Sequence, residues 1–322
     1  MNFRFLCAYN QGLFEKGGIM VSKKNILMIA VILFSICLSG CGRQDKIRQP
    51  GHFDNLKYGE NENQTLDITF PPKEDANGGL ILLIHGGAWV EGDKKNDYTD
   101  GFTKRFEDSG CVIASMNYRF TSSENSVTIS EMLDDIRLVL NFIKDTSEDY
   151  GIHTKNAMLV GWSSGGHMAE LYGYKMSQEA DIPVTCVTAY SGIADLTDKK
   201  LFFDNPLDEI LNRPMTDVGS CLCGYDFDKS NMEAALPYLM EASPVSYTKT
   251  AVPTIICHSK IDTYVNYETA VHLKEELDKN NIDNYFIDFP KSGHDLLLDP
   301  DSLSLSYEKI EEYVKKYCIN GD

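Results

Sequence analysis

The sequence has little positive charge for its size. It contains 30 lysines and arginines against 48 aspartates and glutamates, which gives a formal net charge of −18 at pH 7. Because binding to nucleic acid needs a basic face, this balance argues against a nucleic-acid partner and disfavours polyanionic substrates. We interpret the excess acid as a solvated surface, around a core that the 43% hydrophobic content is sufficient to fill.

The sequence also lacks a cluster of residues with metal-ligand spacing. Cys221 and Cys223 are separated by one residue in a loop-like stretch, but no further ligands lie near them. We therefore expect no metal site at these cysteines. A disulfide from either cysteine stays open, since the sequence does not indicate a partner. Three other cysteines lie in apolar, strand-like runs and are expected to be buried thiols: Cys111, Cys186 and Cys257.

No hydrophobic run favours a membrane-spanning helix. The apolar stretch at 26–38 is short of the ~20 residues that a span needs. It follows Lys23-Lys24 and precedes Leu38-Ser39-Gly40-Cys41, an order typical of a secretory signal. The ending resembles the lipobox of bacterial lipoproteins, which implies that Cys41 is lipidated and becomes the new N-terminus. An ordinary signal peptide or a short anchor helix is the alternative.

These features predict the organisation of the chain. Residues 1–40 are expected to be a signal peptide, and within them residues 1–19 resemble no targeting segment. We interpret 1–19 as an over-extended gene start, with the natural start at Met20. Residues 41–55 are polar and predicted to be a tether, and 56–322 are long enough for one large α/β domain. The expected location is outside the cytoplasmic membrane, anchored through lipid on Cys41.

From residue 56 onward, strand-like and helix-like patterns alternate. Such alternation predicts a doubly wound, mostly parallel sheet with helices on both faces. The stretch at about 191–242 breaks the pattern and is too long for a plain connection, so we expect an insertion of short helices forming a lid. Strands are predicted at 66–70, 80–84, 111–114, 157–160, 183–190, 254–258 and 285–289, and helices at 97–108, 129–143, 267–280 and 307–317.

One motif stands between a predicted strand and a predicted helix. Gly161-Trp162-Ser163-Ser164-Gly165 has the form G-x-S-x-G, which in this setting is typical of a serine nucleophile on a tight turn. The flanking glycines allow the backbone to pass close by, and the helix that follows directs its free amides toward the serine. Small residues that merely pack at a turn would also explain the motif, so other residues must decide.

Polar residues at three further strand ends fit this serine. His85-Gly86-Gly87-Ala88 can supply backbone amides which, with that of Ser164, would form an oxyanion hole. Asp262 and His294 follow the last two predicted strands, and the order serine, acid, histidine is that of an α/β-hydrolase triad. We predict Ser163 as nucleophile, Asp262 as acid and His294 as base. His85, His167 and His258 are interpreted as structural, and Asp288 and Asp295 are the rival acids.

Together these motifs resemble the α/β-hydrolase superfamily, and most of all its BD-FAE-like and hormone-sensitive-lipase-like carboxylesterases. The resemblance is carried by the motifs around His85, Ser163, Asp262 and His294, with Asn117-Tyr118-Arg119 and Ser243-Pro244. It implies an α/β-hydrolase fold with the triad Ser163, Asp262 and His294 and the oxyanion amides of Gly86, Gly87, Ala88 and Ser164. The sequence departs at Ala88, where many relatives have a third glycine or a tyrosine, and at Ser164, where many have alanine.

The activity implied is hydrolysis of small esters through an acyl-enzyme, a reaction for which we expect neither a metal nor an organic cofactor. Acyl groups on extracellular glycans are one substrate class consistent with the expected location. An arylformamidase or a peptidase of the same fold is the first alternative. A surface-binding lipoprotein without catalytic activity is an alternative of another class.

Overall fold

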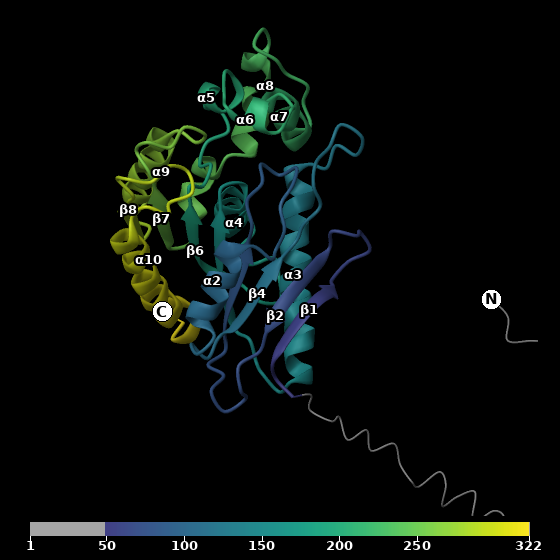
Figure 1. The fold of residues 1–322 in the computed structure, drawn as a ribbon, viewed down its shortest axis with the longest axis vertical. Helices are drawn as coiled ribbons and strands as arrows, with labels where there is room; N and C mark the ends of the chain where they lie inside the picture. The colour runs from purple at the N-terminus through teal and green to yellow at the C-terminus, as the bar shows by residue number, and fades with distance from the viewer. Residues whose placement is uncertain (1–48, 322) are drawn as a thin grey trace, which may run out of the picture. The chain divides into compact units, whose positions relative to one another are not determined.

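In the computed structural model, residues 49–321 are described. Within them the strands form one sheet, in the order β1-β2-β4-β3-β5-β6-β7-β8 (Figure 1). The predicted signal peptide and Cys41 lie outside the described residues. The strands are β1 (His52–Lys57), β2 (Thr65–Thr69), β3 (Gly79–Ile84), β4 (Val112–Met116), β5 (Asn156–Trp162), β6 (Val184–Tyr190), β7 (Thr254–His258) and β8 (Asn284–Asp288).

The sheet is mostly parallel, as the alternation of patterns predicts. Strands β4, β3, β5, β6, β7 and β8 run parallel, and only the pairings of β1 with β2 and of β2 with β4 are antiparallel. All six residues of β3 are buried, because helices cover both faces of the sheet there. Parallel pairing brings the carboxyl ends of these strands to one edge, where loops can gather side chains.

Alternate residues of β3 enter two different apolar layers. Leu80, Leu82 and Ile84 belong to one cluster, and Ile81 and Leu83 belong to another. The first contains α3 (Ile129–Asp149) and α4 (Ser164–Lys175), and α9 (Tyr267–Lys279) packs through a smaller cluster that also includes Tyr174 of α4. The second cluster contains α2 (Asp97–Phe106), α10 (Pro300–Tyr313) and the π-helical segment η2 (Val314–Ile319).

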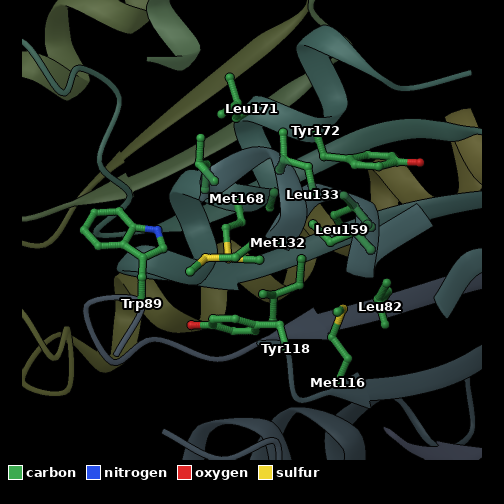
Figure 2. Packing of buried hydrophobic residues seen from close by; sticks show 14 of the residues in the cluster. Leu82, Trp89, Met116, Tyr118, Met132, Leu133, Leu159, Met168, Leu171 and Tyr172 are labelled. Carbon is green, nitrogen blue, oxygen red and sulfur yellow. The ribbon is translucent and has the colours of Figure 1, made fainter. Parts of the chain in front are cut away.

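The long helix α3 shows why the sequence folds this way. It begins at a capping box, in which Thr128 and Glu131 each bond the other's backbone amide. Its apolar residues recur at helical spacing and are buried against α4 and the sheet. Figure 2 shows this layer, with Met132 and Leu133 of α3, Met168, Leu171 and Tyr172 of α4, and Leu82 and Leu159 from the strands.

The stretch that breaks the pattern is an insertion of short helices, as expected. It contains α5 (Lys199–Phe202), α6 (Leu207–Ile210), α7 (Met215–Cys223) and α8 (Met232–Glu241), and the 3₁₀ segment η1 (Pro244–Thr250) leads back to β7. Figure 1 shows α5 to α8 gathered past the strand ends, at the top of the view. Phe202 and Phe227 meet edge to face at 5.1 Å inside the insertion, and both belong to the same apolar cluster as α3 and α4, so the insertion packs on the main core.

The predicted tether is wrong at its C-terminal end. Residues 52–55 were expected in the tether, but they belong to β1, which pairs with β2 through His52 and Thr69 and through Leu56 and Leu66. The register shifts between Phe53 and Leu56, and Asn55 has a φ of 55°. This bulge interrupts the alternation of apolar residues, which is why the pattern does not resemble a strand.

The cysteines of the described part of the chain are all free thiols. Cys111, Cys186 and Cys257 are buried, as predicted, and so is Cys318. Cys221 and Cys223 lie half-buried in and at the end of α7 without a disulfide. Among residues 49–321, no helix is both long and apolar enough to cross a membrane.

Candidate active site

The predicted site residues follow neighbouring strands of the sheet. Ser163 comes directly after β5, and the loop after β3, on one side of β5, begins at His85. Asp262 lies in the loop after β7, and His294 in the loop after β8. Backbone bonds extend the strand order past the strand ends, from Ser163 N to Tyr190 O (2.8 Å) and from Phe289 N to His258 O (2.9 Å). The fold therefore brings these four loops to the same edge.

Ser163 occupies a strained turn. Its φ of 53° and ψ of −118° lie outside the regions favoured by residues with a side chain, and α4 begins at the next residue. The turn is tight enough to need glycine on both sides. A Cβ on Gly161 would lie 2.1 Å from the carbonyl oxygen of Gly165, and one on Gly165 would lie 2.2 Å from that of Ile84. The G-x-S-x-G pattern is thus required by close backbone approach.

Asp262 and His294 form a hydrogen-bonded pair. The Asp262 Oδ2 atom is 2.7 Å from His294 Nδ1, and the Asp262 side chain is fully buried while that of His294 is 21% exposed. Burial on its own would raise the pKa of the Asp262 carboxyl, but hydrogen bonds from His258 and His294 hold that pKa well below its ordinary value. Asp262 is therefore ionised and fixes a proton on His294 Nδ1, which leaves Nε2 free to accept one.

The rival acids have other partners or no contact with this histidine. Asp288 accepts a hydrogen bond from the hydroxyl of Tyr267 and lies 4.0 Å from the Lys260 ammonium. Asp295 follows His294 directly, and its carboxylate accepts the amide of Leu297. Asp262 is the carboxylate that the described structure pairs with His294.

The glycine loop after β3 lies against the serine. A Cβ on Gly86 would be 3.2 Å from Ser163 Cβ. Within residues 49–321, no acceptor is recorded for the backbone amides of Gly87 and Ala88, and Ser164, as the first residue of α4, has no helical acceptor for its amide. Three unpaired donors beside the nucleophile turn are the arrangement that stabilises an oxyanion.

Three consecutive residues of this loop have a left-handed backbone conformation. Gly87, Ala88 and Trp89 have φ values of 124°, 49° and 62°. The carbonyl oxygen of Gly87 accepts the amides of Val90 and Glu91 at 3.0 and 3.1 Å, closing the turn on its far side. Alanine at position 88 therefore adopts a left-handed conformation that glycine reaches more easily, and it keeps an N–H to donate.

His167 ties the glycine loop to the helix and to the insertion. Its Nδ1 accepts a hydrogen bond from Trp89 Nε1 at 3.2 Å, and its Nε2 lies 2.7 Å from the carbonyl oxygen of Ala242. Burial lowers the pKa of His167 to about 4, so the ring is neutral with its proton on Nε2 at physiological pH. The expectation of a satisfied structural histidine holds, and the structure adds what the residue connects.

His85 is also structural, as expected. Its ring is buried and stacks on Tyr118 at 4.6 Å, and its Nδ1 lies 2.6 Å from the carbonyl oxygen of Gly86. The Tyr118 hydroxyl donates to the carbonyl oxygen of His85 at 3.1 Å and lies 3.5 Å from Ser164 Oγ. The hydroxyl of Ser164 thus faces Tyr118 in the interior.

The structure does not join Ser163 to His294 by a direct hydrogen bond in the described residues. Such bonds are often long in enzymes without substrate. The link that it does show runs through Ser191, which follows β6 with a φ of 48° and donates its hydroxyl to the carbonyl oxygen of His294 at 2.9 Å. Ser191 directly follows β6, which lies between β5 and β7, the strands that precede Ser163 and Asp262, so it anchors the histidine loop beside the serine.

Sequence reasoning missed three residues around His294. They are Ser191, Tyr264, whose ring meets the imidazole edge to face at 5.2 Å, and Asp299. The Asp299 carboxylate accepts the amides of Lys291 and Ser292 and the Ser292 hydroxyl, which closes the base of the histidine loop. Only Ser191 carried a signal, because it directly follows a predicted strand at the same edge.

The structure combines this sheet order with a strained serine between β5 and α4 and with an acid–histidine pair. These features are those of the α/β-hydrolase fold. The family model of BD-FAE matches residues 66–277, and the chain belongs to that family. The matched span runs from β2 into α9 and includes Ser163 and Asp262. His294 lies beyond its end.

Curated relatives match at low identity. The chain is 24% identical over 242 residues to the probable carboxylic ester hydrolase LipM of Mycobacterium tuberculosis, covering 71% of this chain and 52% of that protein. It is 26% identical over 143 residues to the probable isoprenylcysteine alpha-carbonyl methylesterase ICME of Oryza sativa, covering 42% of this chain and 33% of that protein. The chain thus spans about half of the first of these relatives and a third of the second.

Solved structures share the fold over nearly their whole length. Esterase B of Lactobacillus rhamnosis superposes with a TM-score of 0.64 at 19% identity, covering 89% of this chain and 94% of that one. A truncated carbohydrate esterase from gut microbiota superposes with a TM-score of 0.62 at 19% identity, covering 84% and 97%. At this identity the likeness establishes the architecture.

Proposed function

We propose that the protein is a serine carboxylic ester hydrolase in which Ser163, His294 and Asp262 form the triad. The observation that carries the proposal is the buried, ionised Asp262 bonded to Nδ1 of a partly exposed His294, at the same sheet edge as the strained Ser163. The names of curated relatives, which include a carboxylic ester hydrolase and methylesterases, support the same reaction class.

The proposed reaction has two acyl-transfer steps. Ser163 Oγ attacks the ester carbonyl while His294 Nε2 takes its proton, and His294 then gives that proton to the leaving alcohol. The amides of Gly87, Ala88 and Ser164 hold the oxyanion, with Gly86 placing the loop against the serine. Water, activated by His294, then releases the acid from the acyl-enzyme and regenerates Ser163. Asp262 orients the imidazole and stabilises its charged form in both steps.

The substrates that we propose are small esters, including acyl groups on extracellular glycans. Support for the glycan class comes from the predicted signal sequence, since an exported enzyme meets esters outside the cell. We propose lipid attachment at Cys41 on the same sequence grounds. Mass spectrometry of the N-terminal peptide from the membrane fraction tests this, and an unmodified Cys41 or a retained residue 40 would contradict it.

Activity on a short-chain p-nitrophenyl ester tests the reaction. Ser163→Ala should lower turnover by ~10⁶, as removal of a triad nucleophile does in other serine hydrolases. Ser164→Ala, one residue away, removes a hydroxyl but keeps the backbone amide and should retain most activity. A folded Ser163→Ala protein with wild-type turnover would overturn the assignment.

A panel of acyl chain lengths, acetylated xylan, formamides and dipeptide amides then separates an esterase from an arylformamidase or a peptidase. A wild-type protein inactive on every arm would favour a non-catalytic surface-binding role.

A further inference from the structure

The carboxylate of Asp262 faces two histidines. Its Oδ2 atom, which accepts the 2.7 Å bond from His294, also lies 3.5 Å from Nε2 of His258. His258 is the last residue of β7, and its side chain is fully buried. It lies four residues before Asp262, at the point where the loop that carries the acid leaves β7.

The contacts of His258 define which nitrogen carries its proton. Nε2 is 3.2 Å from the carbonyl oxygen of Val265, and a carbonyl can only accept, so the proton is on Nε2. Nδ1 is buried without a partner in the described structure. A proton on Nδ1 would be buried there without an acceptor, so the geometry places the proton of His258 on Nε2.

The Nε2–H group of His258 thus faces two acceptors in the acid loop. It is directed to the Val265 carbonyl and to the Asp262 carboxylate, while Asp262 Oδ1 accepts the amides of Tyr264 and Val265 at 2.8 and 3.0 Å. The Oδ1 atom is fixed by the loop itself, and Oδ2 is left for the two histidines. Rotation of the carboxylate away from His294 would break the contact with His258.

We propose that His258 is a positioning residue, which holds the Asp262 carboxylate in the rotamer that bonds His294 Nδ1. The inference rests on the triad of the proposed function and deepens it. His258 does not touch the substrate and does not exchange a proton in the reaction. Its role is to keep the acid from turning, so that the base stays correctly oriented through both acyl-transfer steps.

The groups that pack around His258 give it no competing charge. Asp262 and His294 lie on the loop side, and the Tyr267 ring of α9 meets the imidazole edge to face at 6.0 Å. The Tyr267 hydroxyl points to Asp288, and the Lys260 ammonium lies over the Tyr267 ring at 5.5 Å. Within residues 49–321, Asp262 is the charged side chain that approaches the ring nitrogens of His258.

Two variants separate positioning from packing. His258→Gln keeps an N–H donor at the end of its side chain, and His258→Met fills a similar volume without one. We expect His258→Met to lower kcat by about tenfold or more with KM unchanged and to move the acid limb of the kcat/KM profile to lower pH, because a loosened carboxylate stabilises the His294 imidazolium less. His258→Gln should recover most of kcat and the position of the acid limb.

The proton NMR signal of His294 Nδ1–H provides a readout that does not depend on turnover. It should lie far downfield in the wild-type protein, move upfield or broaden in His258→Met, and return in His258→Gln. An unchanged signal and pH profile in folded His258→Met would overturn the proposal, as would equal behaviour of the two variants.

If His258→Met does not fold, nitrogen-15 NMR of the wild-type protein decides: a proton on His258 Nε2 across the active pH range supports the proposal, and one on Nδ1 overturns it. Failure of the proposed function would instead appear as esterase activity that survives Ser163→Ala.

Discussion

The hydroxyl of Ser191 donates a 2.9 Å hydrogen bond to the main-chain carbonyl of His294. Ser191 is 2% exposed, and its own amide is bonded to the carbonyl of Cys257 at the end of β7. The histidine loop, which leaves the sheet after β8, is therefore held two strands away from its origin. This contact ties the histidine loop to the end of β6, the strand next to the one that precedes Ser163.

Loss of that contact should lower kcat while the protein stays folded. Ser191→Ala removes one hydrogen bond, worth about 1 kcal/mol, and lets the His294 loop move away from Ser163. We expect kcat to fall roughly five- to tenfold with KM little changed. Ser306→Ala is the matched control, because it also deletes a buried hydroxyl, bonded at 2.7 Å to the hydroxyl of Tyr190 in the apolar layer of α2 and α10. Equal losses of kcat in the two variants would show that Ser191 has no special role.

Most of the fold and the triad could be predicted because their signals are local. The apolar run of β3 and the periodic residues of α3 report burial directly, and Ser163 is marked by glycines that its turn requires. Asp262 and His294 could be chosen because each follows a strand, and parallel strands end at one edge.

The remaining features depend on contacts between segments far apart in the chain. The strand β1 was missed because the left-handed Asn55 breaks its alternation. The roles of His258 and Asp299 depend on loop conformation, and no spacing in the sequence reports it. Ser191 follows a predicted strand, but its bond to the histidine loop also depends on how that loop folds. The link from His167 to Trp89 and Ala242 joins residues 78 and 75 positions apart, and a lone histidine in a helix gives no sign of such partners.

The buried carboxyl of Glu170 predicts a pH-dependent stability. Glu170 lies in α4, its Oε2 has no partner in the described structure, and burial raises its pKa to about 8 from an ordinary 4.5. As pH rises above 4.5, the unfolded chain releases this proton while the folded protein keeps it. Folding stability from this group is therefore present below pH 4.5 and is lost as pH rises toward 8, by on the order of 4 kcal/mol.

Glu170→Gln removes this titration and keeps the shape of the side chain. The variant should melt several degrees above the wild-type protein at pH 7.5, and the difference should shrink at pH 5. Glu233→Gln, on the exposed side of α8, is the control and should leave the melting temperature unchanged at both pH values. A Glu170→Gln protein that melts below the wild type at pH 7.5 would show that the carboxylate has a partner in solution.

Close backbone contact at Gly165 predicts an intolerant position. A Cβ there would lie 2.2 Å from the carbonyl oxygen of Ile84 and 2.6 Å from that of His85, so α4 would have to move away from β3. We expect Gly165→Ala to cost ~3 kcal/mol or more, or to prevent folding. Gly101→Ala in α2 is the matched control, since its Cβ meets nothing within 4 Å and alanine favours a helix by up to about 1 kcal/mol. Chemical unfolding should place the two variants on opposite sides of the wild type, and similar midpoints would contradict the packing described.

The proposed function depends on Ser163 being a nucleophile that His294 activates. Labelling of the wild-type protein with a fluorophosphonate, which reacts with activated serines, followed by peptide mass spectrometry, measures this activation at the serine itself. We predict one adduct, on Ser163, with a labelling rate that falls at least 100-fold in His294→Ala, in keeping with the share of general-base catalysis. Folded protein that takes no label, or that carries the label on Ser164 or another serine, would show that Ser163 is not the nucleophile.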